Sequence, residues 1–147
     1  MEPLAIIVDT REQSPFAFPP ESATTRRGTL KAGDYALAGD DRFAIERKSL
    51  DDFLGTLSSG WDRFQRELDR MQEAGFVARV VVVEGTMQDV LAGNHNHSAL
   101  TFGFVAKRLA RLTLMGVSVI FAGDSVMAAG LAWAILNERK NDIEECQ

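Results

Sequence analysis

Apolar segments rich in β-branched residues recur along the chain and predict buried strands. Such segments occupy residues 4–8, 76–83 and 117–121. Short apolar runs of this kind are typical of strands that are covered on both faces. The first of them ends at an acidic residue, Asp9.

Two more strands are expected in the first third of the chain. Residues 29–37 form one of them, interrupted at Gly33, and residues 42–48 form the next. The glycine and two aspartates at 39–41 suit a hairpin loop between them. Residues 10–28 are broken by prolines and are expected to be irregular. The chain therefore opens with a predicted meander of three strands.

A helical period follows these strands. Trp61, Phe64, Leu68 and Met71 recur at spacings of three and four residues. Side chains at these spacings share one face of a helix. The spacing therefore predicts an amphipathic helix over residues 61–74.

Three other helices are expected from their start signals and apolar positions. One begins at Ser49, with Asp52 three residues later in the capping arrangement. Residues 99–115 form the next, capped by Ser98, and residues 124–140 form the last. Alternating strands and helices after a meander predict an α/β fold with a mixed central β-sheet flanked by helices.

Composition limits the class of protein. A length of 147 residues suits a single domain over 1–147. No apolar run approaches the roughly 20 residues that span a bilayer, so a membrane partner is not expected. Cys146 is the one cysteine, which provides neither a disulfide framework nor a cysteine metal site. We therefore expect an intracellular protein, cytoplasmic if it comes from a prokaryote or a phage.

The net charge of −5 argues mildly against nonspecific binding of nucleic acid, which usually requires a basic surface. Nucleases that use a metal ion are a partial exception, because they concentrate carboxylates where the cation binds. The distribution of charge therefore matters more than its sum.

Three charged residues are expected on one face of the hairpin. Glu46 and Lys48 are two positions apart in a strand, so their side chains point to the same side. Counting inward from a turn near residue 40 places Asp34 nearly opposite Glu46. The hairpin would then present two carboxylates and an ammonium group together.

These groups suit the hydrolysis of phosphodiesters. Mg²⁺ binds oxygen ligands, usually one or two carboxylates with water and substrate phosphates. The cation stabilises charge on the phosphate and lowers the pKa of water. Asp34 and Glu46 are therefore the expected ligands, and Lys48 would face the nucleophile.

Each position also has a purely structural interpretation. Glu46 and Lys48 could form a surface ion pair, which contributes under about 1 kcal/mol. Asp34 could bond local backbone at a bulge. Asp52 suits the first turn of a helix, and Asp9 could be a turn residue at the end of a strand. Their occurrence together, in this order, favours an active site.

Three motifs carry a resemblance to a known family. They are Val-Asp-Thr-Arg-Glu at 8–12, Gly-Asp-Tyr at 33–35 and Glu-Arg-Lys-Ser-Leu-Asp-Asp at 46–52. Together they resemble the nuclease domain of the XPF family, a branch of the PD-(D/E)XK nucleases with the signature GD…ERKxxxD. The resemblance extends over about residues 4–125 and implies a restriction-endonuclease-like fold.

The resemblance also implies roles for individual residues. It implies a Mg²⁺- or Mn²⁺-dependent DNA endonuclease in which Asp34 and Glu46 bind the metal and the backbone carbonyl of Arg47 is a further ligand. Lys48 is the implied catalytic lysine. The remaining implied catalytic residues, which support the metal site, are Asp9, itself a candidate ligand, and Asp52.

Candidate DNA contacts come partly from the resemblance and partly from charge. The family pattern places Arg11, Glu12 and Gln65 in the same cleft, and the flexible loop expected before the second strand carries two arginines. The candidate DNA-contacting residues are Arg11, Arg26, Arg27, Arg47 and Gln65.

The resemblance implies branched or flapped DNA as the substrate. Larger family members carry helix-hairpin-helix modules, whereas no such module is expected over residues 1–147, so a separate subunit could supply the targeting. Family members tend to pair through this domain, and the apolar last helix offers a surface for a homodimer.

Other functions stay open at this point. A noncatalytic DNA-binding or partner-docking domain on the same fold is one alternative, and an RNA-cleaving enzyme is another. His95 and His97 could bind a transition metal, but no third ligand is near them in the sequence, so an exposed polar loop is the favoured interpretation.

Overall fold

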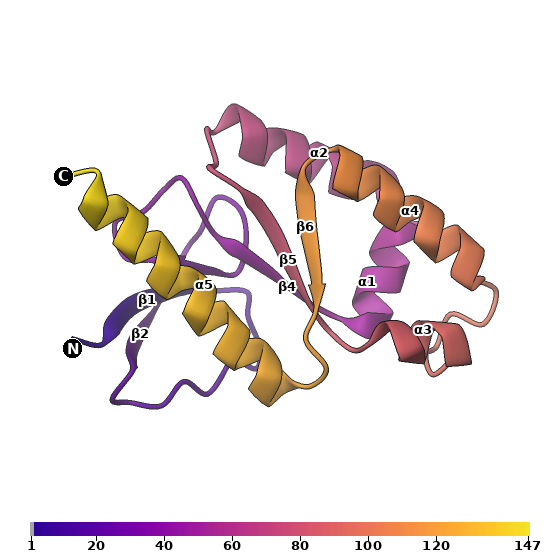
Figure 1. Cartoon of the computed structure of the whole chain (residues 1–147), viewed down its shortest axis with the longest axis horizontal. Coiled ribbons are helices and arrows are strands. Elements are labelled where there is room, and N and C mark those ends of the chain that lie inside the picture. The colour runs from indigo at the N-terminus through magenta and orange to yellow at the C-terminus, as the bar shows by residue number, and fades with distance from the viewer. Residues whose placement is uncertain (1) are drawn as a thin grey trace.

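The computed structural model describes residues 2–147 and contains a six-stranded mixed β-sheet with helices on both faces (Figure 1). The strands are β1 (Leu4–Asp9), β2 (Ala23–Gly28), β3 (Tyr35–Leu37), β4 (Ile45–Ser49), β5 (Arg79–Glu84) and β6 (Val117–Phe121). The helices are α1 (Leu50–Leu57), α2 (Trp61–Glu73), α3 (Met87–Ala92), α4 (Phe102–Leu114) and α5 (Ser125–Glu145). The expected α/β architecture is confirmed.

The order of strands in the sheet is β2-β1-β3-β4-β5-β6. β3 pairs antiparallel with both β1 and β4, so the predicted meander is present. β4, β5 and β6 are parallel to one another. The helical connections between them return the chain to the same end of the sheet, as parallel pairing requires.

The prediction that residues 10–28 are wholly irregular was wrong. Residues 23–28 form β2, an edge strand parallel to β1. Its middle four residues, Thr24 to Arg27, are exposed. A polar edge strand of this kind has neither an apolar run nor an apolar alternation to identify it.

Three local differences also separate the prediction from the structure. β3 is only three residues long, because Gly33 and Asp34 lie in a bend before it. The short helix α3 was not predicted. Thr101, whose side chain accepts a hydrogen bond from the N–H of Phe104, caps α4 in place of Ser98. Ser49 caps α1 as expected, accepting from the N–H of Asp52.

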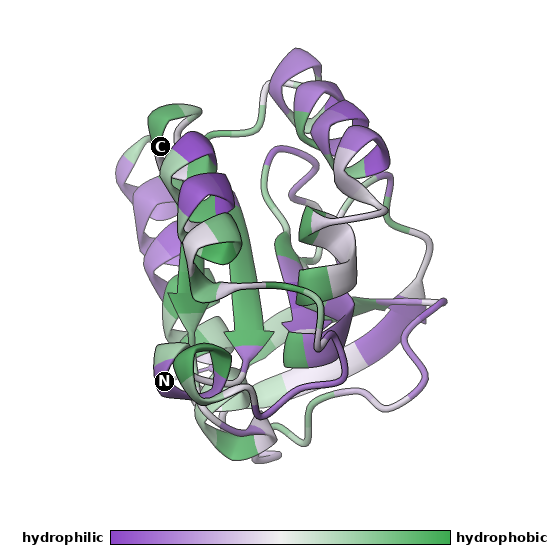
Figure 2. Ribbon diagram, turned by 90° about the vertical axis from the view of Figure 1, so that its right-hand side faces the viewer, coloured by the Kyte–Doolittle hydropathy of each residue, from purple (hydrophilic) through white to green (hydrophobic). Residues whose placement is uncertain are grey.

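Two apolar cores lie on opposite faces of the sheet. One contains Tyr35, Ile45 and Val82 together with the buried face of α5. The other contains Val81 and Val83 together with the apolar faces of α1, α2 and α4. Figure 2 shows hydrophobic residues concentrated in the central strands and hydrophilic residues on outer turns of the helices. Alternate residues of one strand therefore enter different layers.

Within residues 2–147, none of the helices combines the length and the apolar character needed to cross a membrane.

Candidate active site

Asp34 is held between two strands at the edge of the meander. Its N–H donates to the carbonyl of Ile45 at 2.8 Å, and its own carbonyl accepts from the N–H of Asp9 at 2.9 Å. The preceding Gly33 has φ +79°, and a Cβ there would lie 2.6 Å from the Cβ of Ala44. Glycine is thus required for this bend, because another residue would meet both strain and a clash.

The antiparallel register brings Asp34 and Glu46 together. Tyr35 is paired with Ile45, so the next pair outward consists of Asp34 and Glu46. One carboxylate oxygen of Asp34 also accepts from the N–H of Arg47 at 2.8 Å. The predicted juxtaposition of the two carboxylates is therefore present in the structure.

Lys48 projects to the same face of β4 as Glu46. Its Nζ lies 3.7 Å from Oε1 of Glu46, and the two side chains are 23% and 14% exposed. This face is the one covered by α1 and α2, because Glu46 and Lys48 are paired with Val81 and Val83 of that core. The ion pair is thus shielded from solvent, unlike an ordinary surface pair.

Burial disfavours the ionised forms of both carboxylates. It is the main reason that the pKa of Glu46 is raised to about 8; the charge of Asp34 adds to it and Lys48 opposes it. Burial also raises the pKa of Asp34, while the hydrogen bond from the N–H of Arg47 acts in the opposite direction. Two desolvated carboxylates this close would be stabilised by a cation between them.

A hollow of about 230 Å³ lies beside these groups. Its lining includes Asp34, Glu46, Glu67, Arg11 and Arg70. Glu67 comes from α2, and its charge contributes to the raised pKa of Glu46. Acidic residues recur along this helix, and the sequence alone does not distinguish Glu67 from the others. Only the packing of α2 against the sheet reveals that Glu67 faces the hollow.

Asp9 lies at the end of β1, next to Asp34, and is 1% exposed. One oxygen accepts from the N–H of Leu30 at 2.9 Å, and the other accepts from Nε of Arg11 at 2.7 Å. Burial opposes its ionisation, but the hydrogen bonds from Arg11 and Leu30 outweigh it, so the pKa of Asp9 lies below its usual value. Both oxygens already accept hydrogen bonds, and this fits a role in fixing the loop before Asp34 better than metal binding.

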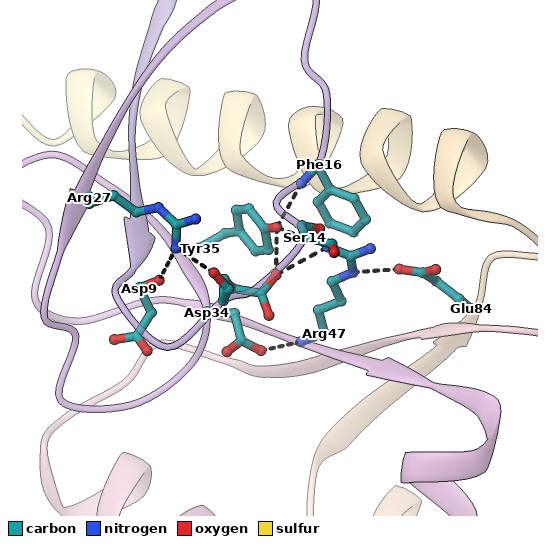
Figure 3. A network of polar contacts seen from close by, with 9 residues as sticks. Asp9, Ser14, Phe16, Arg27, Asp34, Tyr35, Arg47 and Glu84 are labelled. Carbon is teal, nitrogen blue, oxygen red and sulfur yellow. Dashed lines mark hydrogen bonds and ion pairs between the residues drawn. The ribbon is translucent and has the colours of Figure 1, made fainter.

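Arg47 directs its guanidinium to the opposite face of the sheet. Figure 3 shows it among Glu84, Ser14 and Tyr35. Its Nε donates to Glu84 and its Nη1 donates to Glu12 at 3.1 Å, while its guanidinium carbon lies 4.0 Å from the centre of the Phe16 ring. The side chain is 15% exposed. These contacts occupy the guanidinium and leave it poorly placed to contact DNA, whereas the backbone of Arg47 does reach Asp34.

Glu12 belongs to this second network, since it also accepts a hydrogen bond from the hydroxyl of Tyr35 at 2.7 Å. Asp52 is exposed in the first turn of α1, and within residues 2–147 it forms no ion pair with Lys48. Gln65 is half-buried on α2, two positions before Glu67. The structure thus assembles Asp34, Glu46 and Lys48, but places Glu12 elsewhere.

The two arginines expected in a loop lie in β2. Nη1 of Arg27 donates to the carbonyl of Asp9 at 3.1 Å and to the carbonyl of Glu12. Arg27 therefore anchors the turn after β1, as Figure 3 also shows. Arg26 is exposed at the edge of the sheet, and Arg11 is exposed beside the hollow, with a side chain that is 73% accessible.

The donor set suits a hard divalent cation. Among residues 2–147, no group of three or more His, Cys, Asp or Glu side chains is arranged to hold a metal ion by itself. His95 and His97 accordingly form no such site within that range. Asp34 and Glu46 supply two carboxylates, the number from which Mg²⁺ sites are commonly completed by water and substrate phosphate.

Comparison with known proteins shows the family and the fold of the chain. The family model described as the ERCC4 domain matches residues 8–132. Among solved structures, the chain is similar to XPF from Aeropyrum pernix, with a TM-score of 0.68 and 22% sequence identity, over 97% of this chain and 70% of that one. The two share the fold of a mixed sheet flanked by helices. A comparison with curated protein sequences gives no match.

Proposed function

Because the chain belongs to the ERCC4-domain family, whose members are generally nucleases, we propose that it is a divalent-metal-dependent DNA endonuclease. It would hydrolyse phosphodiester bonds in flapped, forked or otherwise branched DNA. The observation that carries the proposal is that Asp34 and Glu46 line one hollow together, with the ammonium of Lys48 3.7 Å from Glu46.

Asp34 and Glu46 would hold Mg²⁺ or Mn²⁺, with the carbonyl of Arg47 as a further candidate ligand. When bound, such a cation offsets charge on the phosphate and makes water a stronger nucleophile. The N–H of Arg47, 2.8 Å from Oδ2 of Asp34, orients that carboxylate. Ligand geometry therefore depends on the backbone between Glu46 and Lys48.

Lys48 and Arg11 would act on the substrate directly. The ammonium of Lys48 is half-buried and positioned by Glu46, so it can donate a hydrogen bond to the phosphate or to the attacking water. Arg11 is held at Nε by Asp9 and is largely exposed. Its Nη2 donates to Asp9 and to the carbonyl of Leu30, which leaves Nη1 to bind a phosphate oxygen at the rim of the hollow.

The test is cleavage of a fluorescently labelled flap or fork by the purified protein with Mg²⁺ or Mn²⁺. Excess EDTA should stop cleavage. Glu46→Gln and Lys48→Ala should each lower turnover by at least about 100-fold. The melting temperature of Glu46→Gln should be close to or above that of the wild type, and Lys48→Ala should still be folded at the assay temperature.

Lys107→Ala is the matched control, because Lys107 is exposed on α4 away from the hollow and its loss should leave turnover unchanged. Normal turnover by Glu46→Gln or Lys48→Ala would disprove the proposed site. Tight binding of the flap without cleavage under any metal would instead support a noncatalytic DNA-binding domain.

A further inference from the structure

A second and larger hollow adjoins the candidate active site. It measures about 530 Å³ and lies among the loop before Asp34, the end of α2 and the segment that leads into β4. Its lining includes Lys31, Ala32, Arg70, Ala74, Phe43 and Phe76. The first three also line the smaller hollow beside Asp34 and Glu46. The two hollows are therefore neighbours that share these three residues.

The floor of the second hollow is apolar, and hydrogen bonds fix the backbone around it. Phe43 is 4% exposed and Ala44 is 3% exposed, while Phe76 is half-buried. The N–H of Val77 donates to the carbonyl of Arg42, and Nε of Arg42 donates to the carbonyl of Gly75 at 3.1 Å. A preformed apolar floor with a few polar groups around it is typical of a site for a small ligand.

Positive charge is placed where the two hollows meet. Lys31 and Arg70 line both hollows and are exposed, and within residues 2–147 neither forms an ion pair. Among the nearby acids, Asp40 is paired with Arg139 at 2.8 Å and is 5% exposed. The other carboxylates of the larger hollow, Asp41 and Glu73, do not line the smaller one. The smaller hollow has its own carboxylates, Asp34, Glu46 and Glu67, at the proposed metal site. Lys31 and Arg70 are thus two cations, unpaired within the described part of the chain, that are available to a phosphate at the boundary between the hollows.

We propose, on the premise of the nuclease function above, that the larger hollow binds an unpaired nucleotide of the DNA strand being cut. Its base would lie against Phe76 and the apolar floor. Lys31 and Arg70 would bind the phosphate that connects this nucleotide to the cleaved one. A base within a duplex is stacked and cannot enter such a hollow, whereas an unpaired base can. The site thus selects substrates that are single-stranded next to the cut.

The first experiment measures binding without chemistry. Fluorescence anisotropy in EDTA would compare wild-type protein on a labelled flap and on a fully paired duplex of the same length. The wild type should prefer the flap. Ala74→Trp should weaken flap binding about tenfold, since a large side chain from this exposed position would fill the hollow. Ala110→Trp, an exposed position on α4, should have no effect.

The second experiment removes the two cations. Lys31→Ala combined with Arg70→Ala should weaken flap binding and reduce the slope of log Kd against log salt by up to about two. Lys107→Ala combined with Arg66→Ala is the control, because these exposed residues line neither hollow. The two tryptophan variants and the two double variants should all retain the wild-type melting temperature within about 2 °C.

The outcomes separate this inference from the proposed nuclease function. If the wild type cuts DNA but Ala74→Trp and the double variant keep the full preference for flaps, the subsite is wrong and the nuclease stands. If no DNA is cut but Ala74→Trp abolishes flap preference, the subsite stands and the nuclease proposal fails. Equal wild-type affinity for flap and duplex would also overturn the subsite.

Discussion

At the scale of single residues, the candidate active site places two carboxylates in one largely buried environment. Asp34 and Glu46 face one another across an antiparallel pair, with one ammonium group in contact with Glu46. One positive charge cannot fully offset two negative ones. Without metal, ionising both carboxylates therefore costs free energy, and the free energy of unfolding should depend on pH.

Glu46 gives the clearest prediction of this kind. Its pKa is raised from an ordinary 4.5 to about 8, by burial first and then by Asp34. Between these values the unfolded chain has lost the proton while the folded protein keeps it. The free energy of unfolding should therefore fall as the pH rises from about 4.5 to about 8. Urea denaturation without metal, at intervals of one pH unit, measures this slope.

Glu46→Gln is the matched variant because it keeps the shape of the side chain but cannot ionise. Its free energy of unfolding should fall less steeply over the same range and exceed that of the wild type most at pH 8. Mg²⁺ should reverse the wild-type trend by stabilising the ionised carboxylates. Parallel pH profiles for the two proteins would contradict the assignment of the raised pKa to Glu46.

Some residues of the candidate site could be predicted from the sequence, and others could not because their position depends on packing. The approach of Asp34 to Glu46 follows from counting along an antiparallel hairpin, and the register agrees with the count. Glu67 could not be found this way, because its neighbours on α2 are also charged and only packing shows which of them faces the sheet. Arg47 was grouped with its neighbours in the motif, although alternation along the strand sends it to the other face.

At the scale of elements, β4 has a different role on each face. Glu46 and Lys48 point toward α1 and α2, whereas Arg47 points toward α5 and joins three segments through Glu12, Tyr35 and Glu84. The first face carries the residues of the proposed active site. The second fixes the position of β4 relative to β5 and to the turn after β1.

Arg47→Met should therefore lower the free energy of unfolding by about 3–5 kcal/mol, since Glu12 and Glu84 would lose their partner in a largely buried place. Their side chains are 16% and 19% exposed. Arg66→Met on the exposed face of α2 should change the free energy by less than about 0.5 kcal/mol. Urea denaturation in parallel gives both values. Equal stability of Arg47→Met and the wild type would show that the network is not a structural anchor.

The elements themselves could be predicted to the extent that they carry an apolar pattern. The strands β1, β5 and β6 and the helix α2 were found because their buried faces are continuous. β2 was missed because its exposed middle residues Thr24 to Arg27 resemble a loop. α3 was missed because its six residues bury only Val90, and so short a helix has almost no period.

At the scale of the whole molecule, the sheet separates the candidate active site from an exposed apolar surface. The hollows that contain Glu46 and Phe76 lie on the side of α2. On the side of α5, a hollow of about 410 Å³ lies between residues 17–22 and the first turns of that helix. Val126 and Met127 beside it are 81% and 61% exposed. Apolar side chains gathered in this way are typical of a protein interface.

We therefore predict that the chain forms a homodimer through this surface. Light scattering at about 10 μM should give twice the mass of the monomer. Val126→Glu should shift the mass to that of the monomer, because a charge would be buried without a partner in the interface. Leu114→Glu is the control, since Leu114 is 76% exposed on α4, outside this hollow.

A monomeric wild type, or a dimer that persists in Val126→Glu, would show that α5 does not mediate pairing. If the Val126→Glu monomer still cut DNA at the wild-type rate, each subunit would contain a complete active site, as the position of Asp34, Glu46 and Lys48 within one chain requires.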